Sequence, residues 1–363
     1  TQGLYAIILG HIIGGILLFG AGLIGGRLRQ GSMNTTAFSF GPLGAKGFAF
    51  LNMLQLIGWT SIMIYDAMLA LQELAPLPPM IWTIAIGALV ILWLFIGLHN
   101  TGYIQAIVSV LLLGLTLYMG AHMISQWPSE ATLLSSGNMS FIAALELSIA
   151  MPLSWLPLIS DYTRESKKPF SASLTSATVY TVTSIVMYTL GLSAAIFGGG
   201  DSIITIMMNA GLGLAGLIVI IFSTVTTTFM DAYSAGVSST TIYKSASSKS
   251  IAVVVTIVGT IAAILYPMDD ITDFLYLIGS VFAPMIAILL ADYFINRQQV
   301  QTLSAYLVRG LIWAVSVGLY HYMLHSESTI GATLPAFTIA FVVTAIIGFI
   351  SHTETSSIEI KQH

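Results

Sequence analysis

The chain has 363 residues, of which 56% are hydrophobic and only 7% are charged. Because a soluble domain carries about 25% charged residues, most of the surface of this protein cannot face water. The formal net charge of −4 gives no basis for binding nucleic acid, and the lack of cysteine excludes disulfides, thiolate metal sites and cysteine nucleophiles.

Eleven apolar segments of the sequence are long enough for membrane spans, since a bilayer core requires about 20 residues of helix. The short alternation typical of a strand barrel is not found in the sequence. We therefore predict an all-α polytopic membrane protein, with one membrane domain at 1–351 and a frayed cytoplasmic tail at 352–363. The predicted spans are 4–25, 45–72, 80–98, 103–124, 139–160, 171–198, 213–242, 251–267, 271–295, 304–325 and 330–351.

The basic residues predict how these spans are oriented. With eleven spans, every Lys and Arg, from Arg27 to Lys361, falls on one side, and the opposite loops contain only acidic charges. Loops rich in Lys and Arg face the cytoplasm. We therefore expect a multi-pass protein of the cell membrane, with Thr1 outside and His363 inside.

The start of the chain suggests a further span upstream. The sequence begins without methionine, three residues before an apolar segment, and a first span without a basic flank would be poorly oriented. We expect twelve spans in the intact protein; a native eleven-span protein with an outside N-terminus is the alternative.

The first two visible spans contain small and aromatic residues at informative positions. Gly10 and Gly14 lie four residues apart, a spacing that lets helices approach closely and that favours a place inside the bundle over a dimer contact. His11 between them is expected to be a packed helix residue rather than a proton relay. In the second span, the indole of Trp59 offers a face on which a flat heterocycle can stack, although a core tryptophan fits the sequence equally well.

The fifth predicted span contains two prolines, Pro152 and Pro157, five residues apart. Each removes a backbone donor and clashes with the preceding turn, and broken backbone in lipid survives only where it lines a cavity or is buried in protein. Transporters bind solute and ion at such discontinuous helices. A packing kink is the alternative, but Ser154, Trp155 and the nearby carboxylate of Glu146 favour a site.

The span at 213–242 opens with Gly211, Gly213 and Gly216, which form a GxGxxG pattern. No strand precedes it, so we reject a dinucleotide site. Further along, Asp231 lies in a polar run of an otherwise apolar helix, on the same face as Thr227. A carboxylate inside a span costs about 2.5–3.5 kcal/mol, so Asp231 is expected to face the bundle interior, where it could bind an exocyclic amine or a proton.

Hydroxyl groups in the same run suit a hard cation. Ser223 and Thr226 could supply oxygen ligands to a sodium ion. The alternative is that these hydroxyls bond back to their own helix. At the inner span ends, Asp161 beside Arg164 and Asp292 beside Arg297 are expected to form gating or structural ion pairs.

Several short sequence motifs, spread over essentially the whole chain, together resemble those of the nucleobase:cation symporter-1 family. Two of them, within 151–157 and 226–234, resemble more narrowly the branch of hydroxymethylpyrimidine carriers known as CytX. The motifs are Gly10-His11-Ile12-Ile13-Gly14, Gly58-Trp59, Met151-Pro152-Leu153-Ser154-Trp155-Leu156-Pro157, Ser160-Asp161-Tyr162-Thr163-Arg164, Thr226-Thr227-Thr228-Phe229-Met230-Asp231-Ala232-Tyr233-Ser234, Phe274-Leu275, Gly279, Ala283-Pro284 and Ala291-Asp292-Tyr293-Phe294.

The resemblance implies a LeuT-like fold of two inverted five-span repeats plus two further spans, of which the first span is absent here. It places Trp59 at the family's stacking tryptophan and Met63 at a polar contact with the substrate. Met151 and Pro152 fall where relatives have a small residue and an aromatic one, so the second stacking ring is lost unless Trp155 takes its place.

The resemblance also implies roles on the span at 213–242. Asp231 falls where relatives often carry an asparagine amide, and Thr227 falls at a second polar contact. A carboxylate there suits an aminopyrimidine, whose amine and adjacent ring nitrogen present a donor beside an acceptor. Thr226 falls at a sodium-ligating hydroxyl, but Val225 takes the position of a second ligand.

The sequence thus predicts a cation-coupled secondary transporter, not an enzyme, that imports a small pyrimidine by alternating access. Hydroxymethylpyrimidine, a thiamine precursor, or a cytosine-like base is the expected solute, and sodium or a proton is the coupling ion, without an organic cofactor. An amino-acid or amine carrier of the same architecture is the first alternative, and a membrane-embedded enzyme or scaffold is the second. An enzyme would need an acid–base or metal constellation that the sequence lacks.

Overall fold

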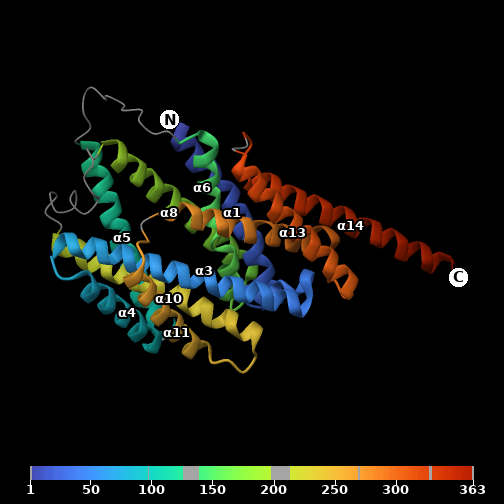
Figure 1. Cartoon of the computed structure of the whole chain (residues 1–363), viewed down its shortest axis with the longest axis horizontal. Helices are drawn as coiled ribbons and strands as arrows, with labels where there is room; N and C mark the ends of the chain where they lie inside the picture. Colours follow the sequence, from blue (N-terminus) through green and yellow to red (C-terminus); the bar gives the residue numbers. More distant parts are fainter. Residues whose placement is uncertain are drawn as a thin grey trace. The chain divides into compact units, whose positions relative to one another are not determined.

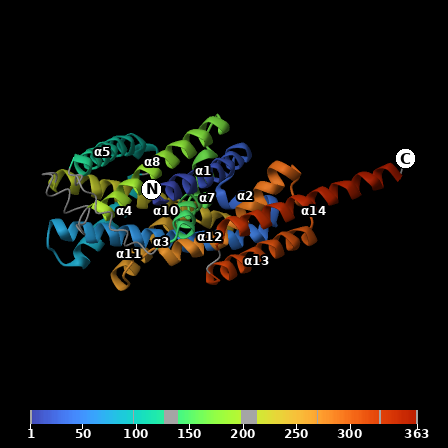
Figure 2. The same ribbon diagram turned by 90° about the horizontal axis from the view of Figure 1, so that it is seen from above.

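The computed structural model describes residues 2–96, 98–125, 139–197, 213–268, 270–326 and 329–361. Within these residues the regular structure is helical (Figures 1 and 2), and ten helices are long and apolar enough to cross a membrane. They coincide with ten of the predicted spans. The eleventh, at 103–124, lies in a helix whose apolar part, Gln105–Tyr118, is shorter. The prediction of an all-α polytopic membrane protein is confirmed.

The described helices follow one another along the chain, and the last one extends beyond its predicted span. The last helix continues through Lys361, and the frayed cytoplasmic tail predicted at 352–363 stays a prediction. The helices are α1 (Gln2–Leu28), α2 (Ser32–Thr35), α3 (Ala37–Leu74), α4 (Pro79–Ile96), α5 (Leu98–Ser125), α6 (Phe141–Leu153), α7 (Leu156–Thr163), α8 (Pro169–Phe197), α10 (Gly213–Ile242), α11 (Ser248–Leu265), α12 (Thr272–Leu290) with a π-helical end η1 (Ala291–Asn296), α13 (Leu303–His325) and α14 (Thr333–Lys361).

The chain folds into two compact units, and α3 and α8 each contribute to both. Unit 1 contains Thr1–Asn52, Met139–Thr183 and Thr272–His363, and unit 2 contains Met53–Asn138 and Ser184–Ile271. The single membrane domain predicted at 1–351 stays a prediction.

In unit 1, α1 packs against α6 and α7, and its glycines make this close approach possible. A Cβ atom added at Gly10 would lie 2.5 Å from the Cβ of Ser148, and one added at Gly14 would lie 2.7 Å from the Cβ of Pro152. His11 is fully buried and hydrogen bonds to the carbonyl of Ile7 at 2.8 Å. As the glycine spacing predicts, α1 lies inside this packing.

Replacing Gly14 by alanine is expected to destabilise the protein, because the new methyl group would overlap Pro152 and force α1 away from α6. Overpacking of this kind costs about 1–3 kcal/mol. Gly47→Ala is the matched control, since nothing lies within 4 Å of a Cβ atom there and alanine favours the helix by about 0.5–1 kcal/mol. Thermal unfolding of the two purified variants should shift in opposite directions; equal shifts would contradict the packing described here.

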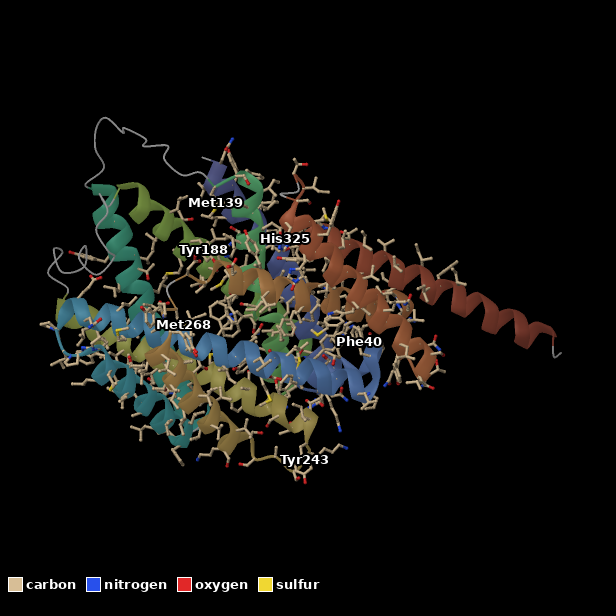
Figure 3. All side chains as sticks on the ribbon, viewed as in Figure 1. Phe40, Met139, Tyr188, Tyr243, Met268 and His325 are labelled. Atoms are coloured by element: carbon tan, nitrogen blue, oxygen red, sulfur yellow. The ribbon has the colours of Figure 1, made fainter. Side chains whose placement is uncertain are left out.

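The start of α3 is sharply bent in unit 1. Gly41 has φ 69° and precedes Pro42, and a Cβ atom at Gly41 would lie 2.7 Å from the ring of Tyr306. Both the left-handed backbone and the close ring require glycine here. Figure 3 labels Phe40 beside this bend, and the Phe40 ring meets that of Phe48 edge to face at 4.7 Å.

Elsewhere in unit 1, a buried ion pair joins the end of α12 to α13. The guanidinium of Arg309 donates to both carboxylate oxygens of Asp292, at 3.0 and 3.3 Å, and Asn296 adds a third hydrogen bond at 2.9 Å. The prediction of an ion pair between Asp292 and Arg297 is therefore wrong, because helix packing brings Arg309 to the carboxylate. Arg297 instead follows η1 in a left-handed conformation, with φ 54°.

Unit 2 is built from α4, α10 and α11, with α5 and the second parts of α3 and α8. In Figure 1, α4, α10 and α11 run side by side at the lower edge of the view. Two apolar clusters hold these helices together. The first is formed by Val90, Trp93, Leu94, Val225, Phe229, Ala232 and Ala252, and the second by Ile64, Ala67, Met68, Leu71, Ile86 and Ala263.

Candidate functional site

The break between α6 and α7 lies where the two prolines predict it. The helix ends at Leu153 and resumes at Leu156, and in between the N–H of Trp155 donates to the carbonyl of Pro152 at 3.1 Å, as in a tight 3₁₀ turn. The carbonyl of Met151 therefore has no helical donor. It accepts instead from the Ser154 hydroxyl at 2.7 Å and from the Tyr180 hydroxyl at 3.2 Å.

The side chains at this break differ in exposure. Pro152 and Ser154 are buried, whereas Met151 and Trp155 are half-buried. The indole of Trp155 meets the ring of Tyr180 at a centroid distance of 5.7 Å. Unit 1 thus brings Met151, Pro152 and Trp155 together around one turn, with an aromatic pair on it.

The carboxylate of Glu146 caps the start of α14 in unit 1. It accepts hydrogen bonds from the N–H groups of Ala332 and Thr333, at 2.9–3.1 Å, and from the Thr333 hydroxyl. These are the free donors at the start of α14, and a negative charge there also interacts favourably with the helix dipole. A substrate contact by Glu146 stays a prediction, but its oxygens already bind the end of a helix.

Asp161 caps another helix in unit 1. Its carboxylate accepts from the N–H of Ser32, at the start of α2, at 2.8 Å, and the Ser32 hydroxyl accepts from the N–H of Ser160 at 3.0 Å. The neighbouring Arg164 pairs with Glu165 at 3.2 Å. These hydrogen bonds join α7 to the start of α2.

Asp231 is the most unusual group of unit 2. It is 4% exposed, and none of the residues that the structure describes donates a hydrogen bond to its carboxylate. Three residues earlier on α10, Thr228 is fully buried. Its hydroxyl has no hydrogen-bond partner within the described residues. Because buried polar groups are nearly always satisfied in proteins, the carboxylate of Asp231 is a candidate for contact with a solute or a cation.

The threonines before Asp231 bond back to their own helix. The hydroxyls of Thr226 and Thr227 both donate to the carbonyl of Ser223, at 3.0 and 2.9 Å, which is the alternative that the sequence left open. Their oxygen lone pairs remain available for a cation or solute. Val225 belongs to the apolar cluster that faces α4, so it offers no ligand.

Trp59 and Met63 lie one turn apart on α3, in unit 2. Trp59 is 6% exposed and Met63 is half-buried, and residues four apart share a helix face. The neighbouring Thr60 packs against α11, where a Cβ atom on Gly259 would lie 2.6 Å from its methyl carbon. Asp66, further along the same helix, is exposed.

Within each unit, the structure therefore groups the predicted residues in sets. Unit 1 groups Met151, Pro152 and Trp155. Unit 2 places Thr227 and Asp231 on one face of α10 and Trp59 and Met63 on one face of α3. Sequence reasoning missed Tyr180, whose only signal is a hydroxyl on an apolar span, where lipid provides no partner.

The sequence is similar to a known family of permeases. A family profile described as "Permease for cytosine/purines, uracil, thiamine, allantoin" matches residues 1–360. The cytosine permease of Escherichia coli strain K12 is 21% identical over 321 residues, which are 86% of this chain and 76% of that protein. The cytosine permease of strain O157:H7 matches over the same shares.

Solved structures of similar fold come from transporters. Mhp1, a nucleobase-cation-symport-1 family transporter, in a closed conformation with bromovinylhydantoin bound, matches with a TM-score of 0.80 and 18% identity, over 98% of this chain and 86% of that one. Its inward-facing conformation gives 0.76 and 18%, over 97% and 84%. A Na⁺-coupled sialic acid symporter gives 0.67 and 17%, over 95% and 83%.

Proposed function

Because the chain belongs to the family of permeases for cytosine/purines, uracil, thiamine and allantoin, and has the LeuT-like fold, we propose that it imports an aminated pyrimidine together with a cation. The family is one of cation-coupled transporters of nucleobase-like solutes. The finer proposal is that the solute is hydroxymethylpyrimidine or a cytosine-like base. The observation that carries it is the buried carboxylate of Asp231, which no described residue satisfies.

The chemistry of an aminopyrimidine suits this carboxylate. Its exocyclic amine donates a hydrogen bond, and the adjacent ring nitrogen accepts one. A protonated carboxyl group presents the complementary pair, an acceptor beside a donor. Asp231 would therefore hold the amine edge of the base, with Thr227 as a second polar contact and Trp59 stacked on the ring.

In unit 1, we propose that the half-buried Met151 and Trp155, with Pro152, form the solute contacts at the helix break. Met63 completes the proposed set on α3. Glu146 is proposed as a weaker contact with the solute than Met151 and Trp155, because its carboxylate already caps α14. The protein is proposed to lie in the cell membrane with its C-terminus in the cytoplasm.

For the coupling cation, the candidates use different groups of α10. Sodium would be held by the hydroxyl oxygens of Ser223 and Thr226, with further ligands, whereas a proton would be carried by Asp231. Hydroxyl ligands suit a hard cation, but Val225 beside Thr226 faces an apolar cluster. Uptake by proteoliposomes under a sodium gradient alone and under a proton gradient alone distinguishes the two.

The experiment that tests the function is uptake of labelled hydroxymethylpyrimidine and cytosine by the protein in proteoliposomes. We expect saturable uptake of at least one of them, which requires a cation gradient. In parallel, a thermal-shift panel compares pyrimidines with zwitterionic amino acids. Stabilisation by a zwitterion but by none of the pyrimidines would replace this proposal with the amine carrier of the same architecture.

Replacing Trp59 by alanine is expected to raise the KM for the pyrimidine about fivefold to 150-fold, because base–aromatic stacking contributes about 1–3 kcal/mol. Trp59→Phe keeps an aromatic face and should recover most of the affinity. Trp82→Ala is the control on α4, where the indole N–H donates to the Ala75 carbonyl at 3.1 Å. A Trp59→Ala variant with the KM of the wild type would remove Trp59 from the site.

A further inference from the structure

The helix break at Met151–Trp155 depends on a residue of another span. The Met151 carbonyl accepts two hydrogen bonds from side chains: one from Ser154, three residues ahead on the same turn, and one from Tyr180 of α8. Only the second comes from outside the broken helix. It fixes the position of the break relative to α8 within unit 1.

Tyr180 holds the same turn in a second way. Its ring packs against the indole of Trp155, at 5.7 Å between centroids and 51° between planes. One side chain therefore contacts both ends of the five-residue segment from Met151 to Trp155: the backbone at its start and the side chain at its end. On its other side, the segment is fixed by Pro152 against Gly14 of α1.

We propose that Tyr180 is a positioning residue for solute binding: it sets the orientation of Trp155 and the path of the Met151 backbone, and thereby the shape of the solute contacts at the helix break. The proposal rests on the proposed function, in which Met151 and Trp155 contact the solute. Tyr180 itself contacts Trp155 and acts through it. The hydroxyl and the ring have separable effects, because one holds the backbone and the other holds the indole.

The first test is a double-mutant cycle on the two donors. Tyr180→Phe removes one donor and keeps the ring, and we expect a KM about twofold to tenfold higher, the loss that a hydrogen bond of ordinary net strength predicts. Ser154→Ala should have an effect of similar size. The double variant leaves the Met151 carbonyl without either of its side-chain donors, so its KM should exceed the product of the two single effects.

Tyr322→Phe is the matched control, because this tyrosine on α13 is 72% exposed. A purely structural role for Tyr180 would lower thermal stability and the amount of protein in the membrane but would leave the KM of the remaining protein unchanged. That result, or a double variant with the KM of the wild type, would overturn the proposal.

The second test does not depend on the identity of the solute. Because the sequence contains no cysteine, a single Met151→Cys variant reports the accessibility of this turn to a small maleimide without background labelling. We expect Tyr180→Phe to change the labelling rate of this variant at least threefold and Tyr322→Phe to leave it unchanged. Equal rates in all backgrounds would refute the positioning role even if no pyrimidine is transported, whereas absent uptake with altered labelling would refute only the proposed solute.

Discussion

Replacing Asp231 by leucine is expected to abolish pyrimidine uptake while raising the thermal stability of the protein. The side chain is 4% exposed, and none of the described residues donates a hydrogen bond to it. A buried polar group without a partner destabilises the fold, so an apolar residue of similar size removes that cost. The same change removes the only group proposed to recognise the amine of the solute. Initial uptake rates at saturating cation should fall more than a hundredfold, and the melting temperature should rise.

Opposite signs in the two measurements distinguish a binding residue from a structural one. A structural carboxylate would lose stability and transport together, whereas a residue irrelevant to transport would keep its uptake within threefold of the wild type. Asp66→Leu is the matched control, because this carboxylate also belongs to unit 2 but is exposed. Asp231→Asn separates charge from shape: uptake that persists without dependence on a proton gradient would identify Asp231 as the carrier of the proton.

Replacing Arg309 by methionine is expected to destabilise the protein by about 3–5 kcal/mol, because it leaves Asp292 buried without its cation. The pair is bidentate, and both side chains are almost fully buried. In the double variant Arg309→Met, Asp292→Asn, no charge is left, so we expect most of the loss to be recovered. The free energy of unfolding in detergent, measured for the four members of the cycle, tests this.

Arg297→Met is the control for a general loss of positive charge at this end of the molecule. Its guanidinium is exposed, and among the described residues Nε donates only to the carbonyl of Phe294, at a long 3.4 Å. Its effect should be below about 0.5 kcal/mol, as is usual at the surface. If Arg309→Met behaved in the same way, the ion pair would have no role in holding α12 to α13.

The sequence was sufficient to predict the helices and the helix break, because lipid leaves the backbone few alternatives. Apolar length locates the spans, and Pro152 and Pro157 locate the interruption between α6 and α7. Both signals are local in the sequence, and neither needs a knowledge of packing.

The partners of the buried charges could not be predicted in the same way. Glu146 binds Thr333, 187 residues later in the chain, and Asp292 binds Arg309 rather than the adjacent Arg297. Such choices depend on which helix faces reach each other, and sequence proximity is a poor guide to this. Tyr180 was missed for the same reason, since its hydroxyl finds the Met151 carbonyl only through the packing of α8 against the break.

The cap that Glu146 places on α14 has a mechanical consequence. Glu146 lies five residues before Met151 on the same helix. Its carboxylate accepts hydrogen bonds from the first turn of α14, and their donors are backbone N–H groups, whose direction is fixed by the helix. Any tilt of α6 would therefore move the first turn of α14 along with it or break these hydrogen bonds. Within unit 1, these hydrogen bonds couple the two helices at this point. A displacement of α6 should therefore carry the start of α14 with it.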